Sequence, residues 1–386
     1  MCGIAGKIHW GPPAEKETVQ RMCEKMIHRG PDDSGLISLD SITLGHRRLS
    51  ILDLSSRAKQ PMVSNDKRYY LVYNGEIYNY RELKRELEES GYKFITTSDT
   101  EVVLYSYIHW RERCLDRFNG MFALALWDSF EKILFIARDR FGKKPLYYHI
   151  NSHGGITFAS ELTALIEDKD IPLKISDEAI NCYLALGYIV SPLTMYTDIY
   201  KLESATYMYL SEKGRNSKKV RYWDFSNSFR YKTKEDQKDI EHHLLYLLEQ
   251  ASNKRVISDV PLGAFLSGGV DSSSIVCLIK KYHKGDLHTF SAGFESESYN
   301  ELPDAKMTSD WIGTIHHNHV CQFKNGLEFV NNAINVFDEP FADNSLIPMI
   351  EVSKLASRYV TVVLSGDGAD ELFAGYMTYQ ADKIYN

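Results

Sequence analysis

The sequence lacks the features that mark membrane-spanning, secreted and nucleic-acid-binding proteins. No stretch approaches the roughly 18 consecutive apolar residues of a membrane-spanning helix, and the chain does not open on a basic region followed by an apolar one. Lysine and arginine total 45 against 52 aspartate and glutamate residues, so the net charge of −7 does not favour binding to nucleic acid or to an anionic membrane. We therefore predict a cytoplasmic protein with neither a membrane nor a nucleic acid as partner.

The six cysteines include no C-x-x-C pair, which argues against a zinc cage and against the disulfide framework of a secreted domain. Five of them are expected to be small buried hydrophobic residues. The remaining one, Cys2, is set apart by its position directly after the initiator methionine.

At 386 residues the chain exceeds one average core, so two domains are expected. In the first part, short apolar runs separated by turn residues predict a strand-rich domain with several helices. The strands are expected at 69–73, 121–127 and 132–137, the helices at 81–90 and 101–110, and a turn at Asn74-Gly75.

A polar segment, 211–239, follows this domain and is expected to be a linker. Beyond it a long helix with one apolar side covers 240–251. Short apolar runs then alternate with helical patterns, at 262–266, 289–294, 319–321 and 360–364. Strands spaced by helices predict a doubly wound parallel sheet, in which ligands bind beyond the carboxyl ends of the strands.

Removal of Met1 would give Cys2 both a thiol and a free α-amine. The reference pKa of an α-amine is about 7.7–8.0, below the value of about 8.5 for a thiol. The amine can therefore accept the thiol proton near neutral pH, as in N-terminal nucleophile enzymes, and no histidine is needed as base. A cysteine at this position can also be incidental, so the interpretation depends on the motifs that accompany it.

The run Ser267-Gly268-Gly269-Val270-Asp271-Ser272 joins a predicted strand to a predicted helix. Adjacent glycines allow a tight turn that points several N–H groups at one place, and the helix N-terminus adds positive potential, so the loop suits an anion. It is not a Walker A loop, because the required spacing and the lysine are absent. Asp271 beside a phosphate would be repelled unless a divalent metal lay between them, and Mg²⁺ suits such oxygen ligands.

A second loop, 364–371, repeats the same order of strand, glycine turn, carboxylates and helix start, with Asp367 and Asp370 among its acidic residues. Two such loops on neighbouring strands would form one pocket for a metal–polyphosphate. The alternative is that each loop is only a helix-capping turn with Ser or Asp as cap.

These motifs carry a family resemblance over nearly the whole chain. Ser-Gly-Gly-x-Asp-Ser resembles the pyrophosphate loop of the ATP pyrophosphatase superfamily. The Cys2-Gly3-Ile4 start, together with the segments 28–32 and 74–79, is similar to a class II glutamine amidotransferase. The combination in this order resembles the glutamine-hydrolysing asparagine synthetases.

The resemblance implies an α/β plus α+β architecture. An Ntn-hydrolase αββα sandwich would cover 1–210 and the linker 211–239. A doubly wound, Rossmann-like ATP-pyrophosphatase domain, incomplete at its C-terminus, would cover 240–386.

The resemblance also implies the roles in the glutaminase half. Cys2 would attack the side-chain amide of glutamine, and its own amine would carry the proton. Asn74 and the N–H of Gly75 would form the oxyanion hole, where removal of one donor typically lowers the rate by about 10²–10³.

Three further residues would hold the glutamine. Arg48 would bind the α-carboxylate through a bidentate fork, Asp99 would bind the α-ammonium, and Glu76 would line the site. The alternative for Arg48 and Asp99 is a surface ion pair or a helix cap, and a cap is natural for Asp99 because a helical pattern follows it.

In the second half, the resemblance implies that ATP and Mg²⁺ serve as cofactors. Asp271 and Asp370 would lie on Mg²⁺–pyrophosphate, and Asp367 near the aspartyl group. The reaction would be adenylation of the aspartate β-carboxylate, followed by attack of ammonia on β-aspartyl-AMP. The implied ATP-contacting residues are Leu266, Ser267, Gly268, Gly269, Asp271, Ser272, Ala292, Ser365 and Gly366.

One departure from the family pattern is visible. The chain ends at Asn386, whereas similar synthetases continue into a further helical region, so we expect a C-terminally truncated chain. Two alternatives stay open: an amidotransferase that acts on a sugar acid or another carboxylate in surface-polysaccharide synthesis, and a truncated remnant without synthetase activity. The segment 339–343 does not settle the acceptor, and the oligomeric state is open, with a homodimer as the candidate.

Overall fold

The computed structural model describes residues 1–11, 15–211, 214–296, 300–321, 330–331, 334 and 336–385. The chain divides into two compact units, one formed by Met1–Lys232 with Phe337–Ala342, the other by Thr233–Val336 with Asp343–Asn386. The segment predicted as a linker, 211–239, differs from that expectation. It contains a strand of the first unit at Gly214–Arg221 and the start of a helix at Gln237, and the boundary falls after Lys232.

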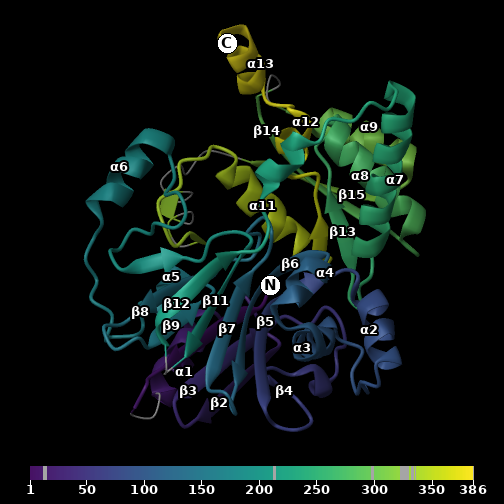
Figure 1. Cartoon of the computed structure of the whole chain (residues 1–386). Helices are drawn as coiled ribbons and strands as arrows, with labels where there is room; N and C mark the ends of the chain where they lie inside the picture. Colours follow the sequence, from purple (N-terminus) through teal and green to yellow (C-terminus); the bar gives the residue numbers. More distant parts are fainter. Residues whose placement is uncertain are drawn as a thin grey trace. The chain divides into compact units, whose positions relative to one another are not determined.

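The first unit is built on two antiparallel six-stranded sheets (Figure 1). One sheet has the order β10-β8-β9-β1-β3-β2 and the other β12-β11-β7-β6-β5-β4. The strands of the first sheet are β1 (Gly3–Ile8), β2 (Asp33–Leu39), β3 (Ile42–Arg48), β8 (Tyr147–Ile150), β9 (Ile156–Ala159) and β10 (Ile199–Lys201). Those of the second sheet are β4 (Met62–Val63), β5 (Tyr69–Ile77), β6 (Gly120–Asp128), β7 (Ile133–Arg138), β11 (Thr206–Ser211) and β12 (Gly214–Arg221).

The two sheets face each other across an apolar core. Ile4 and Ile8 of β1 pack in the same cluster as Val72 of β5 and Trp127 of β6, as alternation along each strand predicts. Helices cover the outer faces: α1 (Lys16–Lys25) and α5 (Leu162–Leu165) pack on the first sheet, and α3 (Asp99–Trp110) on the second, with α2 (Tyr80–Glu89) against α3. This αββα arrangement confirms the sandwich that the sequence predicts. The remaining elements of the unit are α4 (Cys114–Arg117), α6 (Asp177–Leu186) and the 3₁₀ turns at Ser56–Ala58, Arg111–Arg113 and Phe225–Arg230.

The predicted turn at Asn74-Gly75 is wrong. Strand β5 continues through both residues, which pair with Ala123 and Phe122 of β6, and neither has a positive φ. Gly75 is required for space instead, because a Cβ there would lie 2.4 Å from the carbonyl oxygen of Met121. The glycine therefore serves the close approach of two strands.

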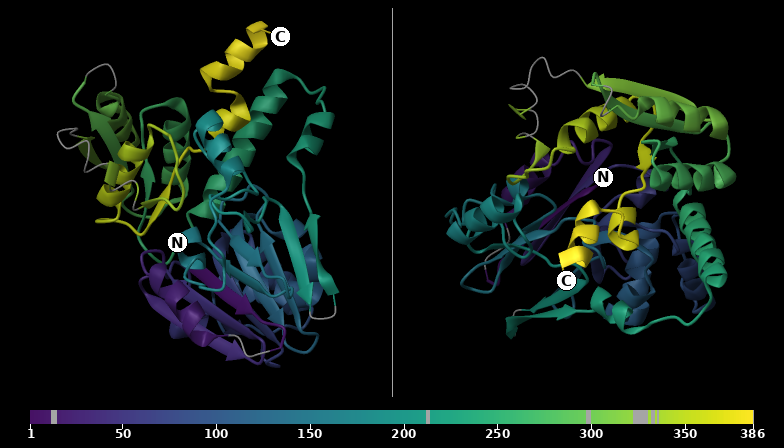
Figure 2. Two further views of the ribbon diagram at one scale, coloured as in Figure 1. Left: turned by 90° about the vertical axis from the view of Figure 1, so that its left-hand side faces the viewer. Right: turned by 90° about the horizontal axis from the view of Figure 1, so that it is seen from above.

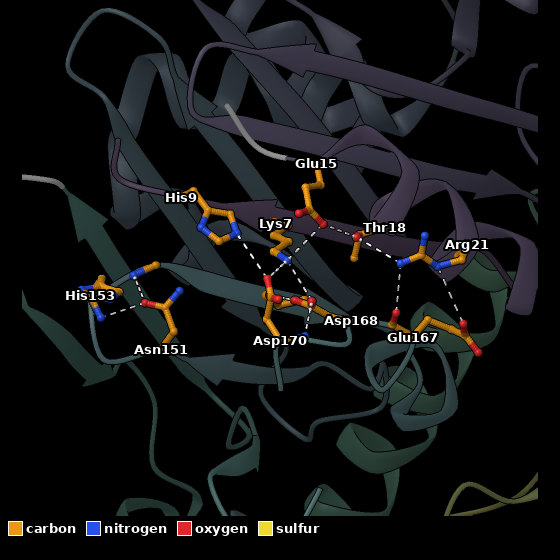
Figure 3. A network of polar contacts seen from close by, with 12 residues as sticks. Lys7, His9, Glu15, Thr18, Arg21, Asn151, His153, Glu167, Asp168 and Asp170 are labelled. Carbon is orange, nitrogen blue, oxygen red and sulfur yellow. Dashed lines mark hydrogen bonds and ion pairs between the residues drawn. The ribbon is translucent and has the colours of Figure 1, made fainter. Parts of the chain in front are cut away.

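The far end of β1 carries a network of charges around the buried Lys7 (Figure 3). The Lys7 ammonium, 2% exposed, donates to Asp168 at 2.8 Å and to Asp170 at 2.7 Å. Thr157 donates to the second oxygen of Asp168 at 2.7 Å, so the buried lysine and its buried carboxylate are both paired.

A short segment from the second half of the sequence belongs to the first unit. Asp338 accepts hydrogen bonds from the N–H groups of Leu162 (2.7 Å) and Thr163 (3.2 Å) at the start of α5. Glu339 accepts from the N–H of Met195 at 2.7 Å and pairs with Lys201 at 2.6 Å, with both side chains largely buried. Residues 337–342 thus complete the first unit.

The second unit contains a four-stranded sheet in the order β15-β14-β13-β16, and every pairing is parallel. Its strands and helices are drawn in green and yellow in Figure 2. Helices α8 and α9 pack in one apolar cluster with β13, and α11 packs with Phe290 of β14 in another. Its strands are β13 (Leu262–Phe265), β14 (His288–Phe294), β15 (Ile315–Cys321) and β16 (Val362–Leu364). Its helices are α7 (Gln237–Arg255), α8 (Val270–Tyr282), α9 (Leu302–Ile312), α11 (Leu346–Ala356), α12 (Ala369–Phe373) and α13 (Met377–Tyr385).

This sheet confirms the predicted doubly wound architecture. Strands β14 and β15 extend the sheet on one side of β13, whereas β16 lies on its other side. The strand order therefore reverses between β13 and β16. Such a switch point is where open α/β sheets bind ligands. Within the part of the chain that the structure describes, no helix is long and apolar enough to cross a membrane.

Candidate functional site

Cys2 lies directly before β1 and is half-buried. Its thiol donates to the carbonyl oxygen of Leu49 at 3.7 Å, and Arg29 Nε donates to the Cys2 carbonyl oxygen at 2.9 Å. Burial raises the pKa of the thiol and lowers that of the N-terminal amine of Met1 to about 6. This amine belongs to Met1, and a general base at Cys2 itself requires removal of Met1, which frees the Cys2 α-amine.

Asn74 on β5 offers an unused donor. Its side chain is 1% exposed, and Nδ2 has no hydrogen-bond partner among the described residues. A buried unpaired N–H group is rare because it has lost its hydration without gaining a partner. A donor of this kind is suited to an oxyanion that is present only during the reaction.

Asp99 is the first residue of α3 and is buried. Its Oδ2 accepts from the Tyr73 hydroxyl at 2.9 Å and from the N–H of Ile77 at 3.0 Å, which fixes it to β5 beside Asn74 and Glu76. Burial raises its pKa. The helix cap itself is Ser98, whose hydroxyl accepts from the N–H of Thr100, so the capping alternative for Asp99 is wrong.

Arg48 is buried at the end of β3 and holds the following loop. Nη1 donates to the carbonyl oxygen of Ser55 at 3.0 Å, while Nη2 donates to those of Leu52 and Asp53. The surface ion-pair alternative for Arg48 is wrong, because its described partners are these carbonyl groups. The charges of Arg48 and Asp99 both act on the Cys2 thiol. The structure therefore brings two of the predicted glutaminase residues, Arg48 and Asp99, near the Cys2 thiol.

Two basic residues of this site were not assigned from the sequence. Arg29 fixes the backbone of Cys2, and its Nη1 pairs with Glu161 at 2.9 Å. Lys144, only 5% exposed, donates to the thioether sulfur of Met1 at 3.0 Å. Arg29 lies within the segment 28–32 that carries part of the family resemblance. Lys144 is the second of two lysines that follow Gly142, and such a pair is typical of an exposed surface.

In the second unit, the loop after β13 has the predicted strand–glycine–helix form. Gly268 has φ +83, and a Cβ there would lie 2.8 Å from the backbone N of Ala305, so this position needs glycine for two reasons. The hydroxyl of Ser267 lies 2.9 Å from that of Ser272, which closes the loop over Gly269 at the N-terminus of α8. Leu266 is buried and bonds through its N–H to Phe290 of β14 at 3.0 Å, one residue before Ser291 and two before half-buried Ala292.

The loop after β16 touches this first loop. Because Ala264 of β13 pairs with Leu364 of β16, both loops leave neighbouring strands in the same direction. A Cβ on Gly366 would lie 3.1 Å from the N of Ser272, which shows that the two turns are in contact. The two loops that the sequence predicts to form one site thus lie side by side at neighbouring strand ends.

The acidic residues of the two loops are accessible. Asp271 is exposed on the first turn of α8, Asp370 is half-buried, and Asp367 is exposed and accepts from Ser365 at 3.0 Å. Among the residues that the structure describes, no three acidic, histidine or cysteine side chains form a metal cage. Two carboxylates nevertheless fit Mg²⁺, which normally binds one or two carboxylates together with phosphate oxygens and water.

The fold and these two sites define a class: an N-terminal-cysteine amidotransferase joined to a nucleotide-loop α/β domain. The model of the glutamine amidotransferase domain matches residues 1–223, and the model of asparagine synthase matches 243–386. The chain belongs to the family of glutamine-hydrolysing asparagine synthetases.

Individual relatives agree. A putative asparagine synthetase [glutamine-hydrolyzing] 2 of Methanocaldococcus jannaschii is 41% identical over 98% of this chain and 76% of its own length. Asparagine synthetase [glutamine-hydrolyzing] 1 of Bacillus subtilis is 37% identical over 98% of this chain and 60% of its own length, so the chain spans less than two thirds of that relative. A solved Bacillus subtilis glutamine phosphoribosylpyrophosphate amidotransferase covers 85% of this chain and 70% of its own at 15% identity and a TM-score of 0.43, a likeness too low to bear on function.

Proposed function

We propose that the chain makes asparagine from aspartate, with glutamine as nitrogen donor and ATP as the source of activation. The observation that carries the glutaminase half is the buried Nδ2 of Asn74 on β5, which has no hydrogen-bond partner among the described residues. The contact between the two glycine turns supports the synthetase half.

In the glutaminase step, the Cys2 α-amine takes the thiol proton as Sγ attacks the side-chain carbonyl carbon of glutamine. Asn74 Nδ2 and the N–H of Gly75 would stabilise the oxyanion. The amine then gives its proton to the leaving nitrogen, the C–N bond breaks, and ammonia leaves a thioester. Water hydrolyses the thioester to glutamate and restores the thiol.

The substrate would be held by the charges that surround Cys2. Asp99 would accept the α-ammonium of glutamine, and burial among the β5 groups keeps it in place. The guanidinium of Arg48 would meet the α-carboxylate while its loop contacts fix its plane. Glu76 would line the same pocket.

In the synthetase step, a β-carboxylate oxygen of aspartate attacks the α-phosphorus of ATP, and pyrophosphate leaves. Ammonia then attacks the acyl carbon of β-aspartyl-AMP, so asparagine forms and AMP departs. The N–H groups of the Ser267–Ser272 loop and of Ser365 and Gly366 would bind the phosphates. Asp271 and Asp370 would hold Mg²⁺, which would neutralise the charge of the leaving pyrophosphate.

All six cysteines are free, which suits the reducing cytoplasm that we propose as the compartment of this protein.

Two variants separate the half-reactions. Cys2→Ala should abolish glutamate formation from glutamine and leave ammonia-dependent synthesis, whereas Asp271→Asn should keep glutamate formation and remove aspartate-stimulated ATP–pyrophosphate exchange. Each variant is the control for the other. Exchange that other carboxylates stimulate and L-aspartate does not would overturn the acceptor, and a well-folded protein free of Met1 that releases no glutamate would overturn the glutaminase.

A further inference from the structure

Lys144 is the buried cation of the glutaminase site that no step above uses. Its side chain is 5% exposed, and its ammonium donates to the sulfur of Met1, the residue whose removal uncovers the Cys2 amine. Burial lowers the pKa of Lys144 to about 8, so the side chain is still charged at neutral pH.

Hydrogen bonds hold the backbone of the turn that carries Lys144. Buried Asp139 accepts hydrogen bonds from the N–H groups of Phe122, Phe141, Lys143 and Lys144, all between 3.0 and 3.1 Å. Arg138 Nε donates to the Lys144 carbonyl oxygen at 2.7 Å. Since Phe122 pairs with Gly75 in the sheet, this turn is tied to the strand that bears the proposed oxyanion hole.

The α-amine of Met1 lies among several charged groups. Burial lowers the pKa of this Met1 amine most; Lys144 and Arg29 lower it further, while Cys2 and Asp32 raise it. The ammonium of Lys144 itself faces Arg29, Glu76, Cys2 and Asp139. Asp99 and Arg48 act on the thiol. Among the described residues, Lys144 and Arg29 are thus cations that act on the amine of Met1, directly before Cys2, and Arg29 is occupied with the Cys2 carbonyl and Glu161.

We propose that Lys144 is a positioning residue of the glutaminase: its buried ammonium, carried by a firmly held turn beside the N-terminus, keeps the Cys2 amine in its basic form and favours the thiolate over the thiol. A positive charge disfavours a second positive charge and stabilises a negative one. The inference rests on the proposed glutaminase function and adds the group that tunes its base.

The test compares three variants of the whole chain, each confirmed by intact mass to have lost Met1. Lys144→Met removes the charge at nearly constant volume, Lys144→Arg keeps the charge, and Lys143→Met changes the exposed neighbouring lysine as a matched control. Glutamate formation from glutamine is followed as kcat/KM over pH values from about 5.5 to 9, where the acidic limb reports the base of the free enzyme.

In Lys144→Met we expect the acidic limb to move to higher pH by about one unit or more, because a unit charge a few Å away in a partly buried site has an effect of this size. The rate at low pH should then fall by about tenfold. Lys144→Arg should restore the wild-type limb, and Lys143→Met should keep it. The pH dependence of Cys2 alkylation by iodoacetamide should move in parallel, without any turnover.

An unmoved acidic limb in Lys144→Met overturns the inference, whether the rate is kept or lowered uniformly at all pH values. Lys144→Gln serves as the second charge-free variant. If neither charge-free variant folds, the role of Lys144 is structural and the inference is also overturned. Absence of glutamate formation in the wild type would instead refute the proposed glutaminase, so the two failures are distinguishable.

Discussion

Asn74→Ala should separate activity from stability. Removal of one oxyanion-hole donor lowers kcat by about 10²–10³, equivalent to about 3–4 kcal/mol of transition-state stabilisation. The folded protein loses little, because Nδ2 of Asn74 has no partner among the described residues and truncation breaks no hydrogen bond there. Truncation relieves the penalty of a buried unpaired donor, about 1–3 kcal/mol, and this offsets the lost packing. We expect the free energy of unfolding to change by less than about 1 kcal/mol.

Gln60→Ala is the matched control, since Gln60 is also a buried amide beside the same strand. Its Nε2 donates to the Tyr73 carbonyl oxygen at 3.1 Å, and its Oε1 accepts from the Tyr73 N–H at 2.6 Å. Truncation there orphans the Tyr73 N–H, so we expect about 1–3 kcal/mol of destabilisation. Urea unfolding gives both stabilities, and glutamate release at saturating glutamine gives kcat. If Asn74→Ala were as destabilised as Gln60→Ala, or kept more than about a tenth of the wild-type kcat, the oxyanion role would be refuted.

Three further changes test other features. Gly268→Ala should weaken ATP binding by at least about tenfold and leave glutamate formation intact, because the new Cβ would strain a positive φ and press on Ala305. Calorimetric titration with ATP measures the affinity, and an unchanged affinity would contradict the role of this loop in phosphate binding. His46, whose pKa burial lowers to about 3, takes up a proton on unfolding between pH 3 and 6.5, so stability is complete above pH 6.5 and is lost as the pH falls, by about 1.4 kcal/mol per pH unit. Urea unfolding across this pH range should give a slope that is smaller in His46→Gln than in the wild type by about this amount; equal slopes would show that His46 does not contribute. Lys7→Met should destabilise the chain by about 3–5 kcal/mol, since it leaves buried Asp168 with an uncompensated charge. The double variant Lys7→Met with Asp168→Asn should recover most of this loss in thermal unfolding. A double variant as unstable as the single one would refute the pairing argument.

The elements with strong patterns could be predicted from the sequence. The apolar runs of β6 and β7 and the i, i+4 leucines of α2 are local features, and the structure forms strands and a helix there. The turn at Asn74-Gly75 failed because local preference favoured positive φ, whereas pairing with β6, nearly fifty residues later, decided the conformation. The expected buried cysteines are buried at positions 23, 114 and 321 and only half-buried at 182 and 277.

The candidate sites likewise contain residues that the sequence could reveal and residues that it could not. The glycine loops could be found because each is one contiguous motif whose backbone geometry depends on its own residues. Lys144 could not, because its burial is created by Asp139 and by the strand that carries Phe122. In the sequence, Lys143 and Lys144 are adjacent lysines, and no local pattern shows which of them is buried.

The segment Phe337–Ala342 has a consequence for anyone who wishes to isolate the amidotransferase half. A protein that ends at the boundary after Lys232 would lack residues 337–342 of this unit. The N–H groups at the start of α5 would then lose their acceptor, Asp338. Lys201 would remain charged and largely buried without its partner Glu339. An excised version should include that hexapeptide, fused through a linker or added as a peptide in trans.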